Sequence, residues 1–324
     1  MNSDMQSPMR SLLHRLIDIV GTLAALLPLV IGVAALSGSD HRWPDILAQF
    51  TAPVLVATLI AVIFAALLRL KATAVTGLVA LLALTIAVWP QWFPSAPTPQ
   101  KDAPTITVYS ANLWAKNTDV TAMALSIAEA DADIILLVEL GDVPADKLDV
   151  LLPDHPYRLV SAPSNLTVAP ARAMVASKWP IKRVPDARRQ HLSAMTASVQ
   201  TPLGEVGVMA AHLTRPWPYQ FQWGQIMQAS EMADIRPYMG RKAIIAGDFN
   251  SVSSARIGRQ VKDTMGLVPA PAPFGTWPTK LPAVFGITID QVWYSPELAL
   301  VDRKLGQDNG SDHRPVITRF TLPR

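Results

Sequence analysis

The chain has 324 residues, of which 50% are hydrophobic and 16% are charged, and its formal net charge is +3. This charge does not by itself indicate nucleic-acid binding, because a surface that follows phosphates needs a larger basic excess. The sequence contains no cysteine, which excludes disulfides, thiolate zinc sites and a cysteine nucleophile. The hydrophobic content predicts a membrane-embedded part beside one water-soluble domain.

Three apolar runs near the N-terminus predict transmembrane helices at residues 16–36, 48–68 and 72–88. Each is close to the length that crosses a hydrocarbon core of roughly 30 Å. Arg10 and Arg15 precede the first run, and Arg69 and Lys71 connect the second to the third, so the positive-inside rule places both segments in the cytoplasm. A cleaved signal peptide is the alternative for the first run, although its apolar stretch exceeds the usual roughly 7 to 15 residues.

Three crossings predict a multi-pass protein of the cytoplasmic (inner) membrane, held in the lipid bilayer by its helices, with the following domain on the extracytoplasmic side. Residues 94–104, PSAPTPQKDAP, are typical of a semi-rigid Pro-rich linker. The predicted division is therefore a membrane anchor at 1–93, the linker at 94–104 and a soluble domain at 105–324.

Short β-rich runs recur in the soluble domain, with helical stretches between some of them. The expected strands are at 106–110, 134–138, 173–177, 195–199, 206–211, 243–246, 292–294 and 316–320, and the expected helices are at 120–130 and 221–238. This pattern predicts an α/β or α+β domain whose strands are mostly buried.

Polar residues occur where these apolar runs begin or end. They are Asn112 in YSANLW, Glu139 in DIILLVEL, His212 in VMAAHL, Asp248 and Asn250 in IIAGDFN, Asp290 before VWYS, and Asp312 and His313 in GSDHRPV. Side chains from separate strands are therefore expected to converge at one edge of a sheet.

The types of these residues indicate a chemistry. Asn112, Glu139 and Asp312 offer only oxygen ligands, which suit Mg²⁺ (or Mn²⁺) better than zinc. Hydrolysis of a phosphate ester needs its charge neutralised, a water activated and a leaving oxygen protonated, and the two histidines with adjacent carboxylates can supply the last two. The sequence predicts a divalent-metal site that binds a phosphate-ester substrate.

The ordered set, above all GDFN together with SDHRPV, resembles the endonuclease/exonuclease/phosphatase (DNase I-like) superfamily over residues 105–320. The resemblance implies an α+β fold, a four-layer α/β/β/α sandwich, and makes residues 105–324 the catalytic domain. It also implies that Asn112, Glu139 and Asp312 hold the metal.

The same resemblance implies roles for the remaining residues. His313, oriented by Asp290, is a candidate general base, and Asp248 is the alternative base, between which the sequence does not decide. His212 would hydrogen-bond the phosphate or act as general acid, and Asn250 would position the phosphate. Two departures from the family pattern are that Val138, not Gln, precedes the Glu, and that no residue matches the tyrosine of AP endonucleases, which argues against AP-site repair.

The resulting prediction is a membrane-anchored, metal-dependent phosphoesterase that acts outside the cytoplasm. Its substrate would be nucleic acid, a phospholipid headgroup or an envelope metabolite. The alternative is a catalytically silent membrane sensor or scaffold that binds a phosphorylated ligand. Protein partners and oligomeric state are not indicated by the sequence.

Overall fold

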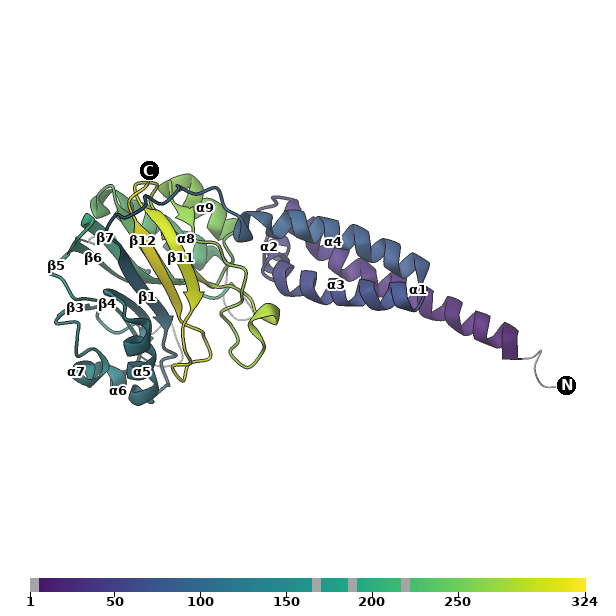
Figure 1. Cartoon of the computed structure of the whole chain (residues 1–324), viewed down its shortest axis with the longest axis horizontal. Helices are drawn as coiled ribbons and strands as arrows, with labels where there is room; N and C mark the ends of the chain where they lie inside the picture. The colour runs from purple at the N-terminus through teal and green to yellow at the C-terminus, as the bar shows by residue number, and fades with distance from the viewer. Residues whose placement is uncertain (1–5, 165–169, 186–190, 217–221) are drawn as a thin grey trace. The chain divides into compact units, whose positions relative to one another are not determined.

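The computed structural model describes residues 6–164, 170–185, 191–216 and 222–324 (Figure 1). The chain divides into two compact units, Met1–Pro90 and Gln91–Arg324. The first unit contains the helices α1 (Gln6–Leu36), α2 (Arg42–Ala48), α3 (Thr51–Leu67) and α4 (Lys71–Trp92), the last of which runs into the second unit.

Two of these helices, the Ser11–Leu36 part of α1 and the whole of α4, are long and apolar enough to cross a membrane. The prediction of three transmembrane helices is therefore corrected. The run expected at 48–68 corresponds to α3, which has 17 residues and follows α2 at an angle of 60°. The described residues contain two candidate spans, or three if α2 and α3 cross as one broken span.

Pro53 explains the break between α2 and α3. Proline has no backbone N–H, and its ring clashes with the carbonyl four residues earlier, so it fits best in the first turn of a helix and kinks or breaks a helix elsewhere. Pro53 occupies that first turn, and the next residue, Val54, donates its N–H to the oxygen of Phe50 at 3.0 Å. The α2 helix consequently cannot continue through this point.

The second unit is built on two six-stranded mixed sheets. The first has the order β11-β12-β1-β2-β4-β3 and consists of β1 (Ile106–Asn112), β2 (Ile134–Leu140), β3 (Tyr157–Val160), β4 (Arg172–Ser177), β11 (Ala299–Leu305) and β12 (Val316–Thr321). The second has the order β5-β6-β7-β8-β10-β9 and consists of β5 (Ile181–Arg183), β6 (Ser193–Thr201), β7 (Gly204–His212), β8 (Ala243–Asp248), β9 (Val268–Pro269) and β10 (Asp290–Tyr294). The pairs β1–β2 and β7–β8 are parallel, and the other pairs are antiparallel.

Helices connect the strands. They are α5 (Val120–Ala130), α6 (Asp142–Ala145), α7 (Leu148–Leu151), α8 (Gln222–Ile235) and α9 (Arg256–Met265), with the short 3₁₀ turns η1 (Arg236–Met239) and η2 (Ala283–Phe285). The strands expected from the sequence all lie within observed strands, and the helix expected at 120–130 is α5. The second expected helix, at 221–238, corresponds to α8 followed by η1, apart from Phe221, which lies outside the described residues.

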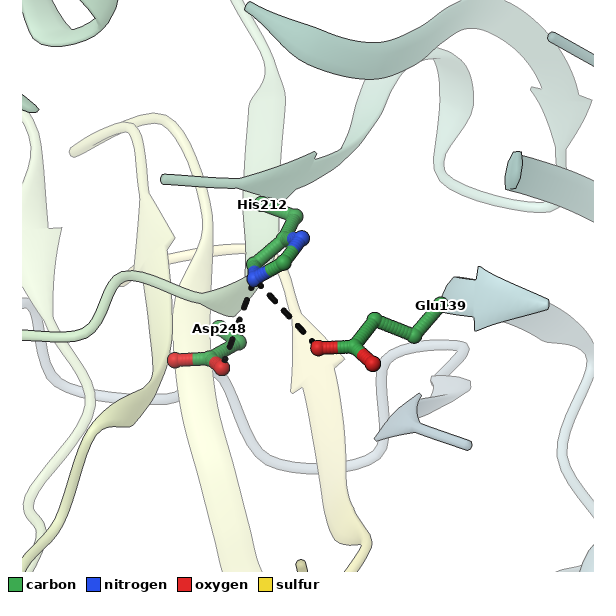
Figure 2. A group of neighbouring side chains, drawn as sticks. All are labelled: Glu139, His212 and Asp248. Carbon is green, nitrogen blue, oxygen red and sulfur yellow. Dashed lines mark ion pairs between the residues drawn. The ribbon is translucent and has the colours of Figure 1, made fainter. Parts of the chain in front are cut away.

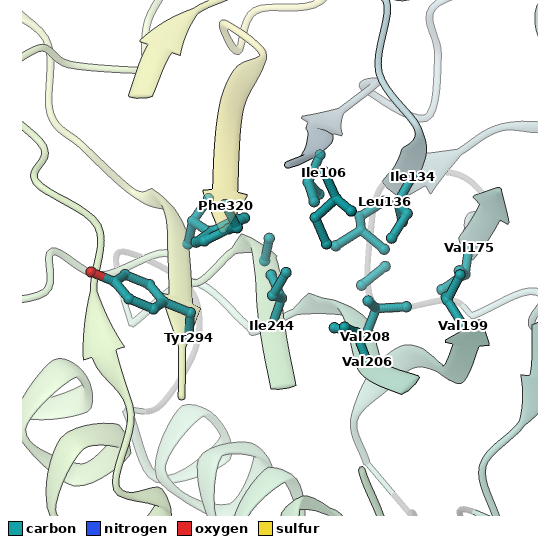
Figure 3. Packing of buried hydrophobic residues seen from close by; sticks show 14 of the residues in the cluster. Ile106, Ile134, Leu136, Val175, Val199, Val206, Val208, Ile244, Tyr294 and Phe320 are labelled. Atoms are coloured by element: carbon teal, nitrogen blue, oxygen red, sulfur yellow. The ribbon is translucent and has the colours of Figure 1, made fainter. Parts of the chain in front are cut away.

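Both faces of each sheet are covered. Between the sheets, Leu136 and Phe320 of the first sheet pack in one cluster with Val208 and Ile244 of the second (Figure 3). On the outer face of the first sheet α5 packs against the strands, and on the outer face of the second sheet α8 and α9 do the same. The two mixed sheets with their helices agree with the predicted α+β sandwich. Burial on both faces explains why the strands are continuous apolar runs in the sequence.

Candidate functional site

The parallel strand pairs bring polar side chains to the same end of each sheet. In the first sheet, Asn112 ends β1 and Glu139 lies near the end of β2, with which β1 is parallel. In the second sheet, His212 ends β7 and Asp248 ends its parallel neighbour β8. Each sheet thus presents a pair of polar side chains at one edge.

Antiparallel neighbours complete this edge. Asp290, the first residue of β10, pairs directly with Asp248. Asp312 and His313 precede β12, which is antiparallel to β1, so their loop comes back to the end of β1. Asn250 follows β8 by two residues. All the residues predicted for the site therefore lie at one end of the sandwich.

Asn112 connects the two sheets at this end. Its Nδ2 donates to Oε1 of Glu139 and to Oδ2 of Asp248, both at 3.0 Å. Its Oδ1 accepts from the backbone N–H of Trp114 at 2.9 Å, and the N–H of Ala115 donates to Oε2 of Glu139 at 3.1 Å. One amide therefore holds two carboxylates from different sheets.

A β-bulge explains how Glu139 reaches the site. In a regular strand, Glu139 would face the same side as Ile135 and Leu137, which contact the α5 layer. Its φ of 51° and the register shift between Leu137 and Leu140 interrupt the alternation. Such a bulge redirects a side chain, and here it accompanies the contact of Glu139 with Asn112.

His212 lies between the two carboxylates (Figure 2). Its Nε2 is 3.5 Å from Oε1 of Glu139 and 3.7 Å from Oδ2 of Asp248. Nδ2 of Asn250 is 3.5 Å from the same imidazole nitrogen and donates to the oxygen of Leu213 at 2.9 Å. The backbone N–H of Asn250 donates to Oδ1 of Asp248 at 2.8 Å. Asp248 is consequently at the centre of the contacts.

His313 forms a buried pair with Asp290, whose Oδ2 is 2.9 Å from Nδ1 of the imidazole. Nε2 of His313 is 3.9 Å from Oδ2 of Asp248 and 4.0 Å from Oδ1 of Asp312. Burial acts to lower the pKa of His313, but the charges of Asp290, Asp248 and Asp312 raise that pKa to about 10. Burial, with the charge of Asp290, raises the pKa of Asp248 to about 6, although His313 and His212 oppose this shift.

The cluster suits a divalent cation. Burial acts to raise the pKa of Glu139, but the charge of His212 and the hydrogen bonds from Asn112 and Ala115 lower it overall, so this carboxylate is ionised at neutral pH. Among the described residues, Oδ1 of Asp290 is buried without a hydrogen-bond partner. A buried group rich in carboxylate oxygens is the donor set that hard divalent cations prefer.

Two overlapping groups in the described part of the chain place ligand atoms within 4.8 Å of one another: Glu139, His212 and Asp248, and Asp248, Asp290 and His313. Asp312 belongs to neither group. The assignment of Asn112, Glu139 and Asp312 as the metal ligands therefore stays a prediction.

Three residues that sequence reasoning missed support the site. Nε1 of Trp277 donates to Oδ2 of Asp312 at 3.0 Å, and Oγ1 of Thr276 accepts from the backbone N–H of Asp290 at 3.1 Å. Nε2 of Gln225 donates to the oxygens of Phe249 and Asn250, at 2.8 and 3.1 Å. These residues lie in a loop and a helix, away from strand ends, so the strand-end pattern gave no signal for them.

The sequence around this site matches a known protein family. A family model described as the Endonuclease/Exonuclease/phosphatase family matches residues 109–313, a range that contains every site residue described above. No curated protein matches the chain.

Solved structures share the fold. An endonuclease/exonuclease/phosphatase from Beutenbergia cavernae DSM 12333 is 18% identical with a TM-score of 0.54, and the match covers 68% of this chain and 72% of that one. The corresponding protein from Bacteroides vulgatus is 14% identical with a TM-score of 0.55, over 68% and 99% of the two chains. The human Nocturnin catalytic domain with bound sulfate is 16% identical with a TM-score of 0.51, over 72% and 99%.

Proposed function

Since the chain belongs to the endonuclease/exonuclease/phosphatase family, whose members are generally metal-dependent hydrolases of phosphate esters, we propose that it is a membrane-anchored enzyme that uses Mg²⁺ or Mn²⁺ to hydrolyse a phosphodiester or phosphomonoester outside the cytoplasm. One observation carries this proposal. The predicted site residues form a single connected set of contacts, in which Asn112 and Asp248 join the two sheets.

The cation would be held by Asn112, Glu139 and Asp312. When bound, it supplies charge neutralisation at a phosphoryl oxygen and lowers the pKa of a bound water. The contact of Glu139 with Asn112 and the hydrogen bond from Trp277 to Asp312 orient two of these side chains before any cation arrives. Such supporting hydrogen bonds are typical of metal sites.

His212 and Asn250 would bind the phosphate. Their side-chain nitrogens are 3.5 Å apart, and both approach the carboxylate of Asp248. Nitrogen donors gathered beside a cation site can stabilise the charge that develops on the phosphoryl oxygens during hydrolysis. In this position His212 can also protonate the leaving oxygen.

Two groups are candidates for the base that activates water. Asp290 holds Nδ1 of His313 and so leaves Nε2 directed at the other carboxylates. A pKa of about 10 keeps this imidazole protonated at neutral pH, so it can act as a base only when the charge of a bound cation lowers that pKa. Asp248 is the alternative, because it is central to the cluster and its pKa of about 6 leaves it ionised at neutral pH. Profiles of rate against pH for His313→Gln and Asp248→Asn, measured at saturating metal, distinguish the two: the variant that lacks the base loses the acidic limb.

The activity is tested with the purified full chain, supplied with Mg²⁺ or Mn²⁺ and assayed on bis-p-nitrophenyl phosphate, DNA and phospholipid vesicles. We expect turnover of at least one substrate, and its loss in His313→Ala but not in His41→Ala, a matched change at an exposed histidine. Inertness towards the whole panel would contradict the proposal. Tight binding of metal and a phosphorylated compound without turnover would favour the sensor or scaffold instead.

The side on which the enzyme acts depends on the bent pair α2–α3. With the N-terminus in the cytoplasm, as Arg10 and Arg15 predict, an extracytoplasmic domain requires the pair to cross the membrane, because two crossings alone would put both chain ends on one side. The chain has no cysteine, so single cysteines at Ser37, Lys71 and Lys101 can be labelled with an impermeant maleimide on intact cells. We expect labelling at Ser37 and Lys101 but not at Lys71; labelling at Ser37 and Lys71 without Lys101 would place the domain inside.

A further inference from the structure

The segment 272–288, here called the β9–β10 loop, exposes large apolar side chains in the second unit. Phe274, Leu281, Val284 and Phe285 are 48%, 45%, 40% and 37% exposed. The loop sequence, APFGTWPTKLPAVFGIT, carries one charged residue, Lys280, and no acidic residue. Single exposed apolar residues are common on protein surfaces, whereas a group of them on one segment indicates an interaction surface.

Hydrogen bonds close the base of this loop. Trp277 and Ile287 exchange backbone bonds of 3.1 and 2.8 Å, and the N–H of Gly275 donates to the oxygen of Ala283 at 2.8 Å. Gly275 and Gly286 pack backbone against backbone, since a Cβ on Gly275 would lie 2.2 Å from the carbonyl carbon of Gly286. The loop is therefore a defined structure that holds its apolar side chains outward.

The loop begins and ends beside the point where the chain leaves an apolar helix. Gln91, the first residue of the second unit, accepts from the N–H of Ala272 at 3.0 Å through its backbone oxygen. Its Nε2 donates to the oxygen of Ala272 at 3.0 Å and to Oγ1 of Thr288 at 3.4 Å. Gln91 lies in the last turn of α4, one of the two candidate spans. Both ends of the loop are thus hydrogen-bonded to a residue in the last turn of a candidate membrane span.

We propose that the β9–β10 loop docks on the lipid bilayer that contains α4, with its apolar side chains in the interface and Lys280 among the headgroups. The inference rests on the membrane-anchoring part of the proposed function. An apolar surface with a basic edge is what binds at the boundary between headgroups and acyl chains, at a depth of about 5 to 10 Å, and anionic lipids add attraction for Lys280. Because Trp277 of this loop also donates to Asp312, docking brings the site close to the headgroup layer.

The test uses the full chain reconstituted in vesicles of phosphatidylcholine and phosphatidylglycerol. Each of three variants receives one cysteine carrying an environment-sensitive fluorophore: Val284→Cys in the loop, Leu82→Cys on α4 and Val150→Cys on an unrelated exposed surface. Lipids with a nitroxide near the headgroup or deep in the acyl chain quench the fluorophore according to its depth. We expect stronger quenching by the shallow nitroxide at Val284, stronger quenching by the deep nitroxide at Leu82, and little quenching at Val150.

The outcomes separate the loop from the anchor. If the Leu82 position is quenched and the Val284 position behaves like Val150, the docking proposal is wrong while the anchor stands. If the Leu82 position is not quenched, the anchor and the docking fail together. A second arm adds Phe285→Asn and Leu281→Asn to the Val284 variant. It should reduce quenching and leave turnover of soluble bis-p-nitrophenyl phosphate unchanged; unchanged quenching would also overturn the proposal.

Discussion

The pair formed by Asp290 and His313 can be tested by the substitution Asp290→Asn. The change keeps the size of the side chain but removes the negative charge 2.9 Å from Nδ1 of the imidazole. We expect the pKa of His313 to fall towards its ordinary value, because the nearest of the charges that raise it is lost. The amide can also hold the imidazole in the wrong tautomer, which should lower kcat by about 10²- to 10⁴-fold.

The size of the effect on stability follows from the same pKa. A rise from 6.5 to about 10, at about 1.4 kcal/mol for each pKa unit, corresponds to about 5 kcal/mol in favour of the protonated imidazole. Asp290 is closer to His313 than Asp248 or Asp312, which lie at 3.9 and 4.0 Å. Because Asp290 makes the largest of the charge interactions that raise this pKa, its loss should cost about 3 kcal/mol of unfolding free energy near neutral pH, the usual order when one partner of a buried ion pair is removed.

The pH dependence gives the sign of the effect. Because the folded-state pKa of His313 is raised, the stabilisation is fully present below the unfolded pKa of 6.5 and is lost as the pH rises through about 10. The free energy of unfolding is measured by denaturant titration in EDTA from pH 6 to pH 10.5. The difference between wild type and Asp290→Asn should shrink as the pH rises. The control, Asp302→Asn, makes the same charge change at an exposed position; a matching profile in both variants would refute this reasoning.

Three further outcomes are expected. In Gly247→Ala, the new Cβ would lie 2.1 Å from a backbone oxygen, so the variant should fail to fold or lose about 3 kcal/mol or more of unfolding free energy in a denaturant titration. The control Gly240→Ala has open space around its Cβ and should lose about 1 kcal/mol. Because burial lowers the pKa of His155, thermal stability should fall as the pH drops below about 6.5, and less in His155→Gln. Mg²⁺ at a hundredfold excess over its Kd should raise the unfolding free energy of wild type and of the exposed-site control Glu129→Gln by about 2.7 kcal/mol, but not that of Glu139→Gln. An equal increase in all three proteins would exclude Glu139 as a ligand.

The strands and the site residues could be predicted because their causes are local. Strands buried on both faces are apolar at nearly every position, so β2 and β8 can be recognised in the sequence as continuous apolar runs. Parallel pairing then places the ends of neighbouring strands together, which is why Asn112 could be expected beside Glu139, and His212 beside Asp248. Edge strands lack this signal. The strand β11 has one buried residue in seven and carries charged residues, so no apolar run marks it.

The remaining features depend on contacts between distant residues. The bulge at Glu139 arises where β2 shifts register against β4, and no residue type in the sequence requires it. The position of Trp277 against Asp312 joins residues 35 apart. By contrast, the break between α2 and α3, which makes the helix of the expected span begin at Thr51, has a local cause in Pro53. The apolar residues of that run indicated how long it is, but they did not indicate where its helical hydrogen bonds begin.

The contact between Asn112 and Asp248 links the assembly of the site to the packing of the sheets. Asn112 belongs to the first sheet and Asp248 to the second, and their hydrogen bond lies beside the cluster that fills the space between the sheets. The acidic residues can therefore come together only when the sandwich has closed, and closing it buries their charges at an energetic cost. A bound cation would offset that cost only in the folded state, because the unfolded chain cannot place these ligands together. Metal affinity and the stability of the sandwich are consequently expected to be coupled in this unit.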